Sequence, residues 1–388
     1  KNESEYKASF LSRMSHEIRT PMNGIIGMLT LARNTQDTKQ EDYYLQQAQD
    51  ISQYLLSLIN EVLDMSRMEA GKLELENKPF NIYHLEPQLN NIFKETIEKK
   101  DVMFKIEYFD FDVKYFVGDE LRIMQILVNL LSNASKFTEK GEIKVTFRQM
   151  YKEDQVANIM MRVHDTGKGM SREFLSHIFR PFEQEGVEIS KKYGGSGLGM
   201  AISDQLVKLM GGEIVVDSLE GKGSDFTVFL NLPISTNQQY EDEKEVVVEE
   251  FSFDQKRILL AEDNDINAEI CLSVLNAKGA FVERVENGQV AVETFKKHAE
   301  HYYDLILMDI QMPEMNGYEA TQAIRSLNRE DSQSIPIFAL SADAYVENKR
   351  YSKKMGMNGH FSKPIDFDEM EKELGQFFSR RDIDEKNI

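Results

Sequence analysis

A histidine near the start of the chain is the first residue placed to do chemistry. His16 and Thr20 are four residues apart, which puts them one turn apart on one face of a helix, and Glu17 adjoins the histidine. Pro21 removes the hydrogen bond to the carbonyl of Glu17, so we expect a kink just past the histidine. A flexed helix that presents an exposed imidazole suits a nucleophile, although a His-Glu pair on a helix is more often an ordinary solvated pair.

Residues 119–137 place a second polar set on one helical face, while apolar side chains fill the other face. The set, at three- and four-residue steps, is Arg122, Gln125, Asn129, Asn133 and Lys136. Neutral amide oxygens suit a hard cation such as Mg²⁺, which takes a few oxygen ligands together with water and substrate phosphate. Lys136 can neutralise phosphate charge. By itself, the stripe is also what an ordinary solvent-facing helix shows.

Two glycine motifs follow that helix. The first is H-D-T-G-K-G-M, which contains Asp165, Gly167 and Gly169, and the second is Y-G-G-S-G-L-G-M-A-I, which contains Gly194, Gly195, Gly197 and Gly199. A glycine-rich loop that enters a helix presents backbone N–H groups to phosphates, and small residues allow a close approach. The spacing excludes the dinucleotide-binding fingerprint G-x-G-x-x-G and the P-loop. Either motif alone could be a simple turn.

In the last third of the chain, reactive side chains stand where short apolar runs end. They are Glu262 and Asp263, Asp309, Ser341 and Lys363. Because the carboxyl ends of parallel strands meet in one crevice, we expect these groups to converge. Carboxylates with one lysine suit Mg²⁺ and a phosphoryl group.

Composition limits what the chain can be. Its 388 residues, 41% apolar and 29% charged, are ordinary for two or three soluble domains. A net charge of −20 repels phosphate backbones, so we expect no direct nucleic-acid binding. A single cysteine, Cys271, excludes an internal disulfide and fits a reducing compartment. We find no apolar window long enough for a membrane span, and since residue 1 is lysine we expect a piece of a longer protein.

The elements that must position His16 are helices. Apolar residues recur at three- and four-residue steps from about Glu5 to Leu75, and the polar stretch Asn34 to Gln40 interrupts them. We predict a helical hairpin in residues 1–77. Two helices cannot cover their own apolar stripe, so we expect a second copy to complete a four-helix bundle, which makes the protein a homodimer.

Residues 78–234 change to a mixed pattern, which predicts an α/β sandwich domain. Strands are expected at Glu142–Phe147, Asn158–Val163 and Asp225–Leu230, and helices at Leu85–Lys99, Asp119–Phe137 and Leu198–Met210. Residues 235–254 are acidic and read as a linker. From 255 to 388, apolar runs at 257–261, 304–308 and 335–340 alternate with helical patterns, which predicts a doubly wound parallel sheet of the flavodoxin-like type.

The motifs together resemble those of hybrid sensor histidine kinases. The string F-L-S-R-M-S-H-E-I-R-T-P-M-N-G-I-I-G-M resembles the dimerisation and phosphoacceptor box. The asparagine helix followed by the two glycine motifs, with F-R-P-F-E-Q between them, resembles the Bergerat-type ATP site shared with gyrases, MutL proteins and heat-shock chaperones. The last domain, with M-D-I-Q-M-P-E-M-N-G, resembles response-regulator receivers over nearly its whole length.

The resemblance implies roles in an ATP site. Asp165 reads the adenine amino group, Asn133 ligates Mg²⁺, and Asn129 and Lys136 face the phosphates. A mobile lid from Phe179 to about Gly194 would close over the nucleotide. The further residues expected to bind the nucleotide are Gly167, Gly169, Phe182, Gly195, Gly197 and Gly199. In ATP-hydrolysing members of that fold, a glutamate stands where this chain has Asn129. An amide cannot act as a general base, which favours transfer to a protein over hydrolysis.

The resemblance also implies roles in the receiver. Asp309 accepts the phosphoryl group and, with Glu262 and Asp263, holds Mg²⁺, while Lys363 pairs with the acyl phosphate and Ser341 senses it. Three residues before the lysine, where receivers usually carry Tyr or Phe, this chain has His360. Since histidine changes its charge near pH 6.5, we expect the output conformation to depend on pH.

The implied function is an ATP-dependent phosphorelay. His16 is phosphorylated, with Glu17 as proton acceptor, and passes the group to Asp309; Thr20 matches the family's phosphatase position. No second histidine box is visible, so output is expected to pass to a separate histidine phosphotransfer protein or response regulator. A cytoplasmic location follows, with any membrane contact made by segments outside this chain. A non-catalytic regulator and an ATP-driven clamp with a receiver are the alternatives, and transfer within or across the dimer stays open.

Overall fold

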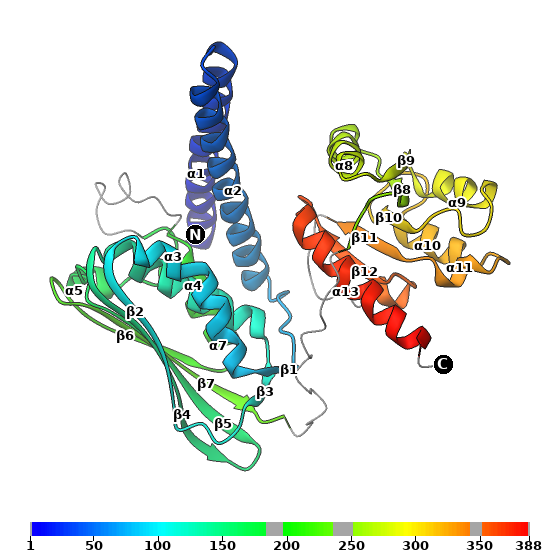
Figure 1. Ribbon diagram of the computed structural model, residues 1–388. Helices are drawn as coiled ribbons and strands as arrows, with labels where there is room; N and C mark the ends of the chain where they lie inside the picture. The colour runs from blue at the N-terminus through cyan, green and yellow to red at the C-terminus, as the bar shows by residue number, and fades with distance from the viewer. Residues whose placement is uncertain (1, 184–196, 236–250, 342–350, 387–388) are drawn as a thin grey trace. The chain divides into compact units, whose positions relative to one another are not determined.

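The computed structural model describes residues 2–183, 197–235, 251–341 and 351–386 (Figure 1). The chain divides into two compact units, Lys1–Gln239 and Tyr240–Ile388. Among the described residues, no helix combines the length and the apolar character that a membrane crossing requires.

The first unit begins with the predicted hairpin, formed by α1 (Asn2–Asn34) and α2 (Thr38–Glu69) (Figure 1). Asp37 begins α2 by accepting a hydrogen bond from the backbone N–H of Lys39 at 3.0 Å. α1 runs through Pro21 as one uninterrupted helix, and Gly24 lies against Ile51 of α2. The two helices leave many large apolar side chains between 36% and 60% exposed: Met22, Ile26, Leu29, Leu31, Tyr43, Leu45, Tyr54, Leu56 and Leu63.

The rest of this unit is the predicted α/β sandwich. Its five-stranded sheet has the order β2-β4-β5-β7-β6, in which β2 and β4 are parallel and the other neighbours antiparallel. The strands are β2 (Asp101–Phe109), β4 (Lys140–Glu153), β5 (Val156–Asp165), β6 (Glu213–Leu219) and β7 (Gly223–Pro233). β1 (Lys78–Asn81) and β3 (Tyr115–Gly118) form a separate antiparallel pair, and the short 3₁₀ turn Ile82–His84 directly follows β1.

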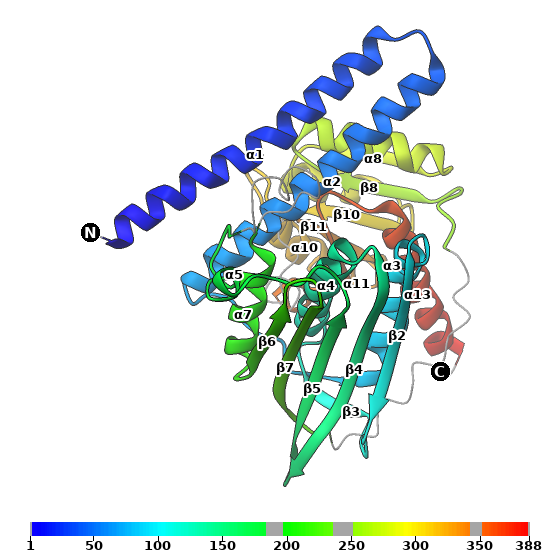
Figure 2. The same cartoon turned by 90° about the vertical axis from the view of Figure 1, so that its left-hand side faces the viewer.

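Three helices cover one face of this sheet, as Figure 2 shows from the side of the strands. They are α3 (Leu85–Glu98), α4 (Glu120–Phe137) and α7 (Gly199–Leu209); α5 (Arg172–Leu175) is a single turn. Alternate strand residues and the inward helix faces form one core, which Met68 and Leu73 join from the base of α2. Asp119 begins α4 by accepting a hydrogen bond from the Arg122 N–H. The predicted helices and strands of this domain are confirmed; β1, β2, β3 and β6 are additions.

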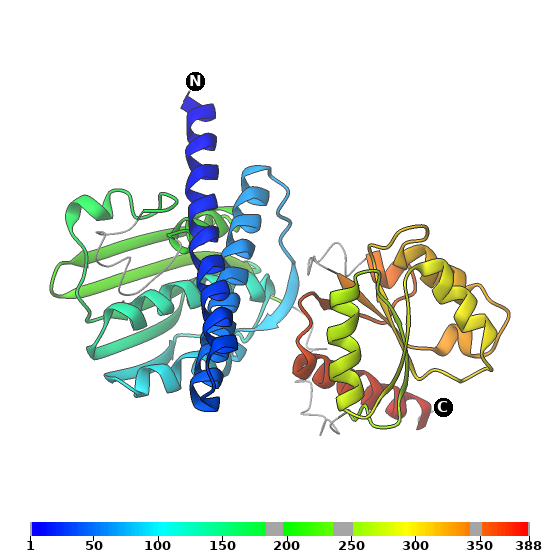
Figure 3. The same ribbon diagram turned by 90° about the horizontal axis from the view of Figure 1, so that it is seen from above.

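The second unit is the predicted parallel sheet, with the order β12-β11-β10-β8-β9 that doubly wound flavodoxin-like folds have. Its strands are β8 (Arg257–Ala261), β9 (Phe281–Val285), β10 (Leu305–Asp309), β11 (Ile337–Ser341) and β12 (Gly359–Ser362). Helices α8 (Asp265–Ala277) and α13 (Phe367–Lys386) lie on one face, and α9 (Gly288–Lys297) and α10 (Gly317–Arg325) on the other, with the short α11 (Asp331–Ser334) after α10 (Figure 3). Each face has its own apolar core.

The expected linker, residues 235–254, is only partly within the described residues, since 236–250 lie outside them. Phe253 is 1% exposed in the core between the sheet, α8 and α13. The Phe251 ring stacks on Phe378, with centroids 5.0 Å apart. The receiver therefore begins before residue 255, because two aromatic side chains from the predicted linker belong to its core.

Candidate functional site

The histidine is exposed on α1, as the predicted nucleophilic role would require. His16 and Thr20 lie on the surface of the helix, and Glu17 is half-buried beside them. The Thr20 hydroxyl donates to the backbone carbonyl of His16 at 3.2 Å. The imidazole therefore stands open to an incoming group, with one carboxylate and one hydroxyl within a helical turn.

The polar face of α4 divides into two parts with different partners. At its amino end, Arg122 donates to the carboxylate of Asp64 on α2 at 2.8 Å, and Gln125 donates to it at 3.1 Å. Asp64 is buried, at 6% exposed. Arg122 and Gln125 thus contact the hairpin, whereas the sequence placed them on one stripe with the residues predicted to bind the nucleotide.

The carboxyl half of α4 carries the three predicted nucleotide-site residues. The Asn129 amide donates to the Gly199 carbonyl at 3.2 Å and to the Ser203 hydroxyl at 3.3 Å, so it binds the start of α7. Asn133 is half-buried one turn later. Burial, followed by repulsion from the nearby Lys168 ammonium, lowers the pKa of Lys136. An anion placed between these two lysines would relieve that repulsion.

Asp165 ends β5 and is 5% exposed. Burial raises the pKa of its carboxyl above the ordinary value, although a hydrogen bond from the Gly167 N–H at 2.8 Å acts in the opposite direction. A Cβ on Gly167 would lie 2.5 Å from the Phe137 carbonyl, so only glycine fits there. Gly169 has φ +65 and is similarly crowded by the Leu219 carbonyl.

The second glycine motif leads into α7. Gly197 has φ +70 and packs on the backbone of Phe182, whose N–H donates to the Gly197 carbonyl at 3.0 Å. Gly199 begins α7 with its Cα beside the Asn129 amide. The structure thus brings Asn129, Phe182 and Gly197–Gly199 together. Gly195 and most of the expected lid, residues 184–194, lie outside the described residues.

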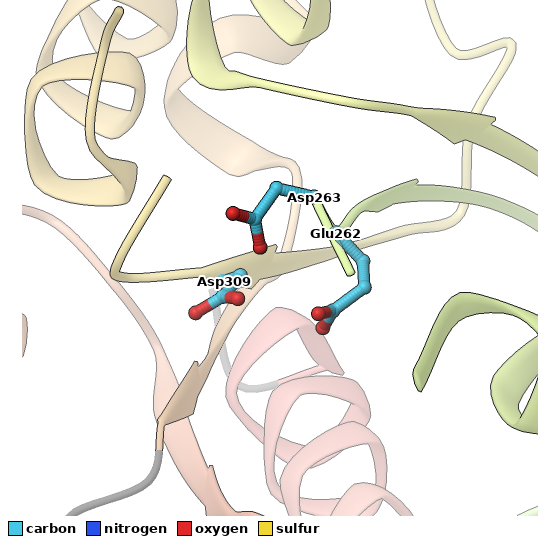
Figure 4. A group of neighbouring side chains, drawn as sticks. All are labelled: Glu262, Asp263 and Asp309. Atoms are coloured by element: carbon cyan, nitrogen blue, oxygen red, sulfur yellow. The ribbon is translucent and has the colours of Figure 1, made fainter. Parts of the chain in front are cut away.

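In the receiver, the three predicted carboxylates converge at the ends of β8 and β10, as Figure 4 shows. One oxygen from each of Glu262, Asp263 and Asp309 lies within 4.8 Å of the others. Glu262 and Asp309 are buried and Asp263 is exposed. Hard oxygen donors that face one another at this distance fit Mg²⁺, and the exposed Asp263 leaves the group open to solvent.

Lys363 joins this group from the end of β12. Its ammonium lies 2.5 Å from an Asp309 oxygen and 2.6 Å from a Glu262 oxygen. Burial alone would lower the pKa of Lys363, but the hydrogen bonds to Asp309 and Glu262 outweigh burial and raise it. Burial raises the pKa of Asp309, even though Lys363 acts in the opposite direction. The lysine therefore stays charged beside the carboxylate.

Ser341 and His360 lie together on the neighbouring strands β11 and β12. The Ser341 Oγ is 2.9 Å from the His360 Nε2, and both side chains are buried. The backbone N–H of Lys363 donates to the backbone carbonyl of Ser341 at 2.7 Å, so the Ser341–His360 pair is directly connected to the lysine. The His360 imidazole is thus turned toward the hydroxyl that the resemblance assigns to sensing.

An open pocket of about 670 Å³ adjoins the carboxylates. Asp263 forms one wall, and the residues that follow β10 form the rest: Ile310, Gln311, Met312, Pro313, Asn316 and Tyr318. The pocket thus lies beside the exposed carboxylate of the group, Asp263, and against the residues that directly follow Asp309 in the chain.

Sequence reasoning missed the partners that lie far along the chain. Asp64 lies 58 residues before Arg122, and its segment carries no motif that points to α4. Ser203 is fully buried under Asn129. Lys168 could have been found, because it stands inside the first glycine motif.

Comparisons with known proteins assign each part of the chain to a family. Residues 6–71 match the His Kinase A (phospho-acceptor) domain, and residues 118–234 match the histidine kinase-, DNA gyrase B- and HSP90-like ATPases. Residues 258–375 match the response regulator receiver domain.

Relatives match across these domains. The autoinducer 2 sensor kinase/phosphatase LuxQ of Vibrio vulnificus is 36% identical over 96% of this chain and 43% of its own length. The aerobic respiration control sensor protein ArcB of Escherichia coli is 32% identical over 98% of this chain and 48% of its own. This chain thus spans less than half the length of these relatives.

Among solved structures, full-length ShkA in complex with AMPPNP matches with a TM-score of 0.45 and 24% identity, over 95% of this chain and 99% of that one. The three domain matches and the sequence relatives together identify the family. The chain belongs to the hybrid histidine kinases, with their phosphoacceptor, ATP-binding and receiver domains in one polypeptide.

Proposed function

We propose that this chain transfers a phosphoryl group from ATP to His16 and then from His16 to Asp309. The observation that carries the proposal is the presence in one chain of an exposed imidazole and a buried carboxylate held by a lysine. The first is suited to donate a phosphoryl group to other surfaces, and the second to accept one. Two of the curated relatives are named as a sensor kinase/phosphatase and a sensor protein, which agrees with this assignment.

In the first step, a ring nitrogen of His16 attacks the γ-phosphorus of ATP. The bond to the bridging oxygen breaks, and ADP leaves with its electron pair. Glu17 takes the proton from the other ring nitrogen, which sharpens the nucleophile. Lys136 offsets charge on the transferring group, and positioning supplies most of the rate.

The nucleotide is held by mostly neutral groups. Asp165 would accept a hydrogen bond from the adenine amino group, while Gly167, Gly169, Gly195, Gly197 and Gly199 would admit the nucleotide near the backbone. Asn129 already donates to the Gly199 carbonyl, and an amide cannot activate water. That supports transfer to histidine over hydrolysis of ATP.

In the second step, an oxygen of Asp309 attacks the phosphorus on His16, and the imidazole leaves with the electron pair. Lys363, already paired with Asp309, would stay with the acyl phosphate, and Ser341 would meet its oxygens. His360 lies against Ser341 and would turn with it, so we propose that this pair reports the state of Asp309.

Mg²⁺ fits both sites by the chemistry of their donors. Glu262, Asp263 and Asp309 would hold it in the receiver, and Asn133 would hold it with phosphate oxygens in the ATP site. When bound, the ion supplies positive charge that offsets the charge on the phosphoryl oxygens.

We further propose that the protein works as a homodimer. The apolar residues that the hairpin leaves exposed would pair with those of a second copy into a four-helix bundle. Thr20 would orient water toward phosphorylated Asp309, which gives the chain a phosphatase activity.

Onward transfer would go to a separate histidine phosphotransfer protein or response regulator. Because the chain carries a net charge of −20, we assign its output to protein partners and none to nucleic acid. The chain would be the cytoplasmic portion of a longer sensor, with any membrane anchor outside it.

The test is covalent labelling of the full chain with Mg²⁺ and γ-labelled ATP. We expect acid-labile, base-stable label at His16 and base-labile label at Asp309. His16→Gln should lose both, Asp309→Asn should keep only the first, and His84→Gln, a change at another exposed histidine, should keep both. Steady ATP hydrolysis without any protein label would replace the proposal with an ATP-driven clamp.

A further inference from the structure

The buried carboxylate of Asp64 connects the hairpin to the ATP-binding domain. Its two oxygens accept from the Arg122 guanidinium at 2.8 and 3.4 Å, and one also accepts from the Gln125 amide at 3.1 Å. The Arg122 guanidinium donates to the Gln125 oxygen at 2.7 Å as well, so the three side chains form one closed network. The Asp64 and Arg122 side chains are only 9% and 12% exposed. Since water screens this pair little, both its charge and its geometry matter.

Both partners of Asp64 lie on the helix that carries the nucleotide-site residues. Arg122 and Asn133 are eleven residues apart on α4, or about 16 Å along a rigid helix. A helix of this length moves as one body, so fixing its amino end on the hairpin also fixes the place of Asn129, Asn133 and Lys136 relative to α2.

Asp64 also lies close to the level of the phosphoacceptor. Gly24 of α1 lies against Ile51 of α2. Continuing this antiparallel register puts His16 level with Ile59, and Asp64 is then five residues further, about 7 Å along the axis. Along the hairpin axis, the attachment point of α4 is thus about one and a half turns of helix from the level of the histidine.

The remaining described contacts at this joint are less specific. Met68 and Leu73 enter the apolar core of the domain, and the Glu76 N–H donates to the Asp119 carboxylate at 2.9 Å. Apolar side chains can slide past one another at little cost. A carboxylate that accepts hydrogen bonds from both Arg122 and Gln125 instead sets one orientation of α4 relative to α2. The network therefore has the stronger influence on the angle between α2 and α4.

We propose that Asp64 is a positioning residue for histidine phosphorylation, which acts through Arg122 and Gln125 to hold the nucleotide-bearing helix at a set place beside His16. This inference rests on the proposed function. It assigns to Asp64 no contact with ATP. Removal of the carboxylate should therefore change how often bound ATP reaches the imidazole, while ATP itself binds as before.

The experiment measures kcat and the KM for ATP of His16 labelling in the full chain. Asp64→Ala and the isosteric Asp64→Asn should each lower kcat about tenfold and leave KM within about twofold. Glu69→Ala, which removes an exposed carboxylate five residues further along α2, should change neither. Asp64→Arg combined with Arg122→Asp should recover part of the lost kcat, because the ion pair is rebuilt in reverse.

Three results would overturn the inference. An unchanged kcat in both Asp64 variants would leave the network without a role in transfer. A rise in KM that matches the loss of rate would make it a support of the ATP site alone, and a higher kcat would make it an inhibitory latch. Should Asp64→Ala fail to fold, Asp64→Asn and the reversed pair decide. Absence of label in the wild-type chain would instead defeat the proposed function.

Discussion

The two proposed phosphoacceptors of this chain are set in opposite surroundings. His16 is exposed on a helix, with Glu17 and Thr20 as its near neighbours along α1. Asp309 is 4% exposed at a strand end, with Lys363 at 2.5 Å and two further carboxylates beside it. The difference follows from what each must do. A histidine that reacts first in a nucleotide site and then in a receiver must be accessible to both. The groups that stabilise the transferring phosphoryl group must therefore belong to those two sites.

The same contrast separates the two units in their use of charge. Among the described residues of the proposed ATP site, Asp165 is the buried carboxylate, and amides, glycines and Lys136 accompany it, whereas the receiver gathers three carboxylates and a lysine. A site with fewer charged groups can release ADP more readily, because fewer of them must be solvated again. A site with more charged groups would hold a metal ion and an acyl phosphate in place.

Of the changes considered, removal of the Lys363 ammonium should have the largest effect, and it should affect Asp309 without affecting His16. Lys363→Met leaves Asp309 and Glu262 as buried carboxylates without their cation, so we expect transfer from His16 to Asp309 to slow about a hundredfold, with labelling of His16 unchanged. Rapid-quench measurement of the base-labile label tests this. Lys278→Met is the control, because it removes a surface ion pair with Glu371 in the same unit. Loss of His16 labelling in Lys363→Met would contradict the view that the two phosphoacceptors depend on separate groups.

Replacement of Thr20 should have an intermediate effect. If its hydroxyl orients water toward phosphorylated Asp309, Thr20→Ala should slow dephosphorylation about tenfold and spare labelling of His16. The control is Thr30→Ala, since Thr30 is also exposed on α1 and also donates to the carbonyl four residues before it. Decay of the base-labile label gives the rate. Equal effects of the two variants, or loss of both activities in Thr20→Ala, would make the threonine structural.

A pH titration should give the smallest effect and concerns Asp165. Burial raises the pKa of this carboxyl, so its protonated fraction grows at a higher pH than for an ordinary aspartate. The ionised form would accept the hydrogen bond from adenine more strongly, and therefore ATP affinity should fall as the pH is lowered from 7 to 5. Calorimetric titration of ATP measures this, with ITP, which lacks the amino group, as the control. An equal fall for ITP would assign the effect to another group.

The receiver site could be predicted from sequence because topology places its residues. Parallel strands bring their carboxyl ends to one edge, so Glu262, Asp309 and Lys363 converge whatever the loops do. The ATP site was harder, because a helical stripe shows which side chains share a face but not what they touch. Arg122 and Asn133 look equivalent in the sequence, and only the fold shows that Arg122 pairs with Asp64.

Strand β2 was missed although its alternation was readable. Val102, Phe104, Ile106 and Tyr108 all point to the core side of Asp101–Phe109. The predicted end of the acidic linker, residue 254, was wrong for another reason. Its charges suggested an unpacked segment, but they say nothing of the two aromatic residues that follow, and the Phe251 ring stacks on Phe378, more than a hundred residues away.

Those two aromatic residues decide where the receiver can be cut. A fragment that starts at residue 255 would lack the Phe253 side chain and open a hole next to α8 and α13; filling such a position is worth about 1.5–3 kcal/mol. It would also lack Phe251 and so uncover the ring of Phe378, near the carboxyl end of the chain. Expression boundaries for the isolated receiver therefore belong upstream of Phe251, where the acidic residues supply solubility in addition to length.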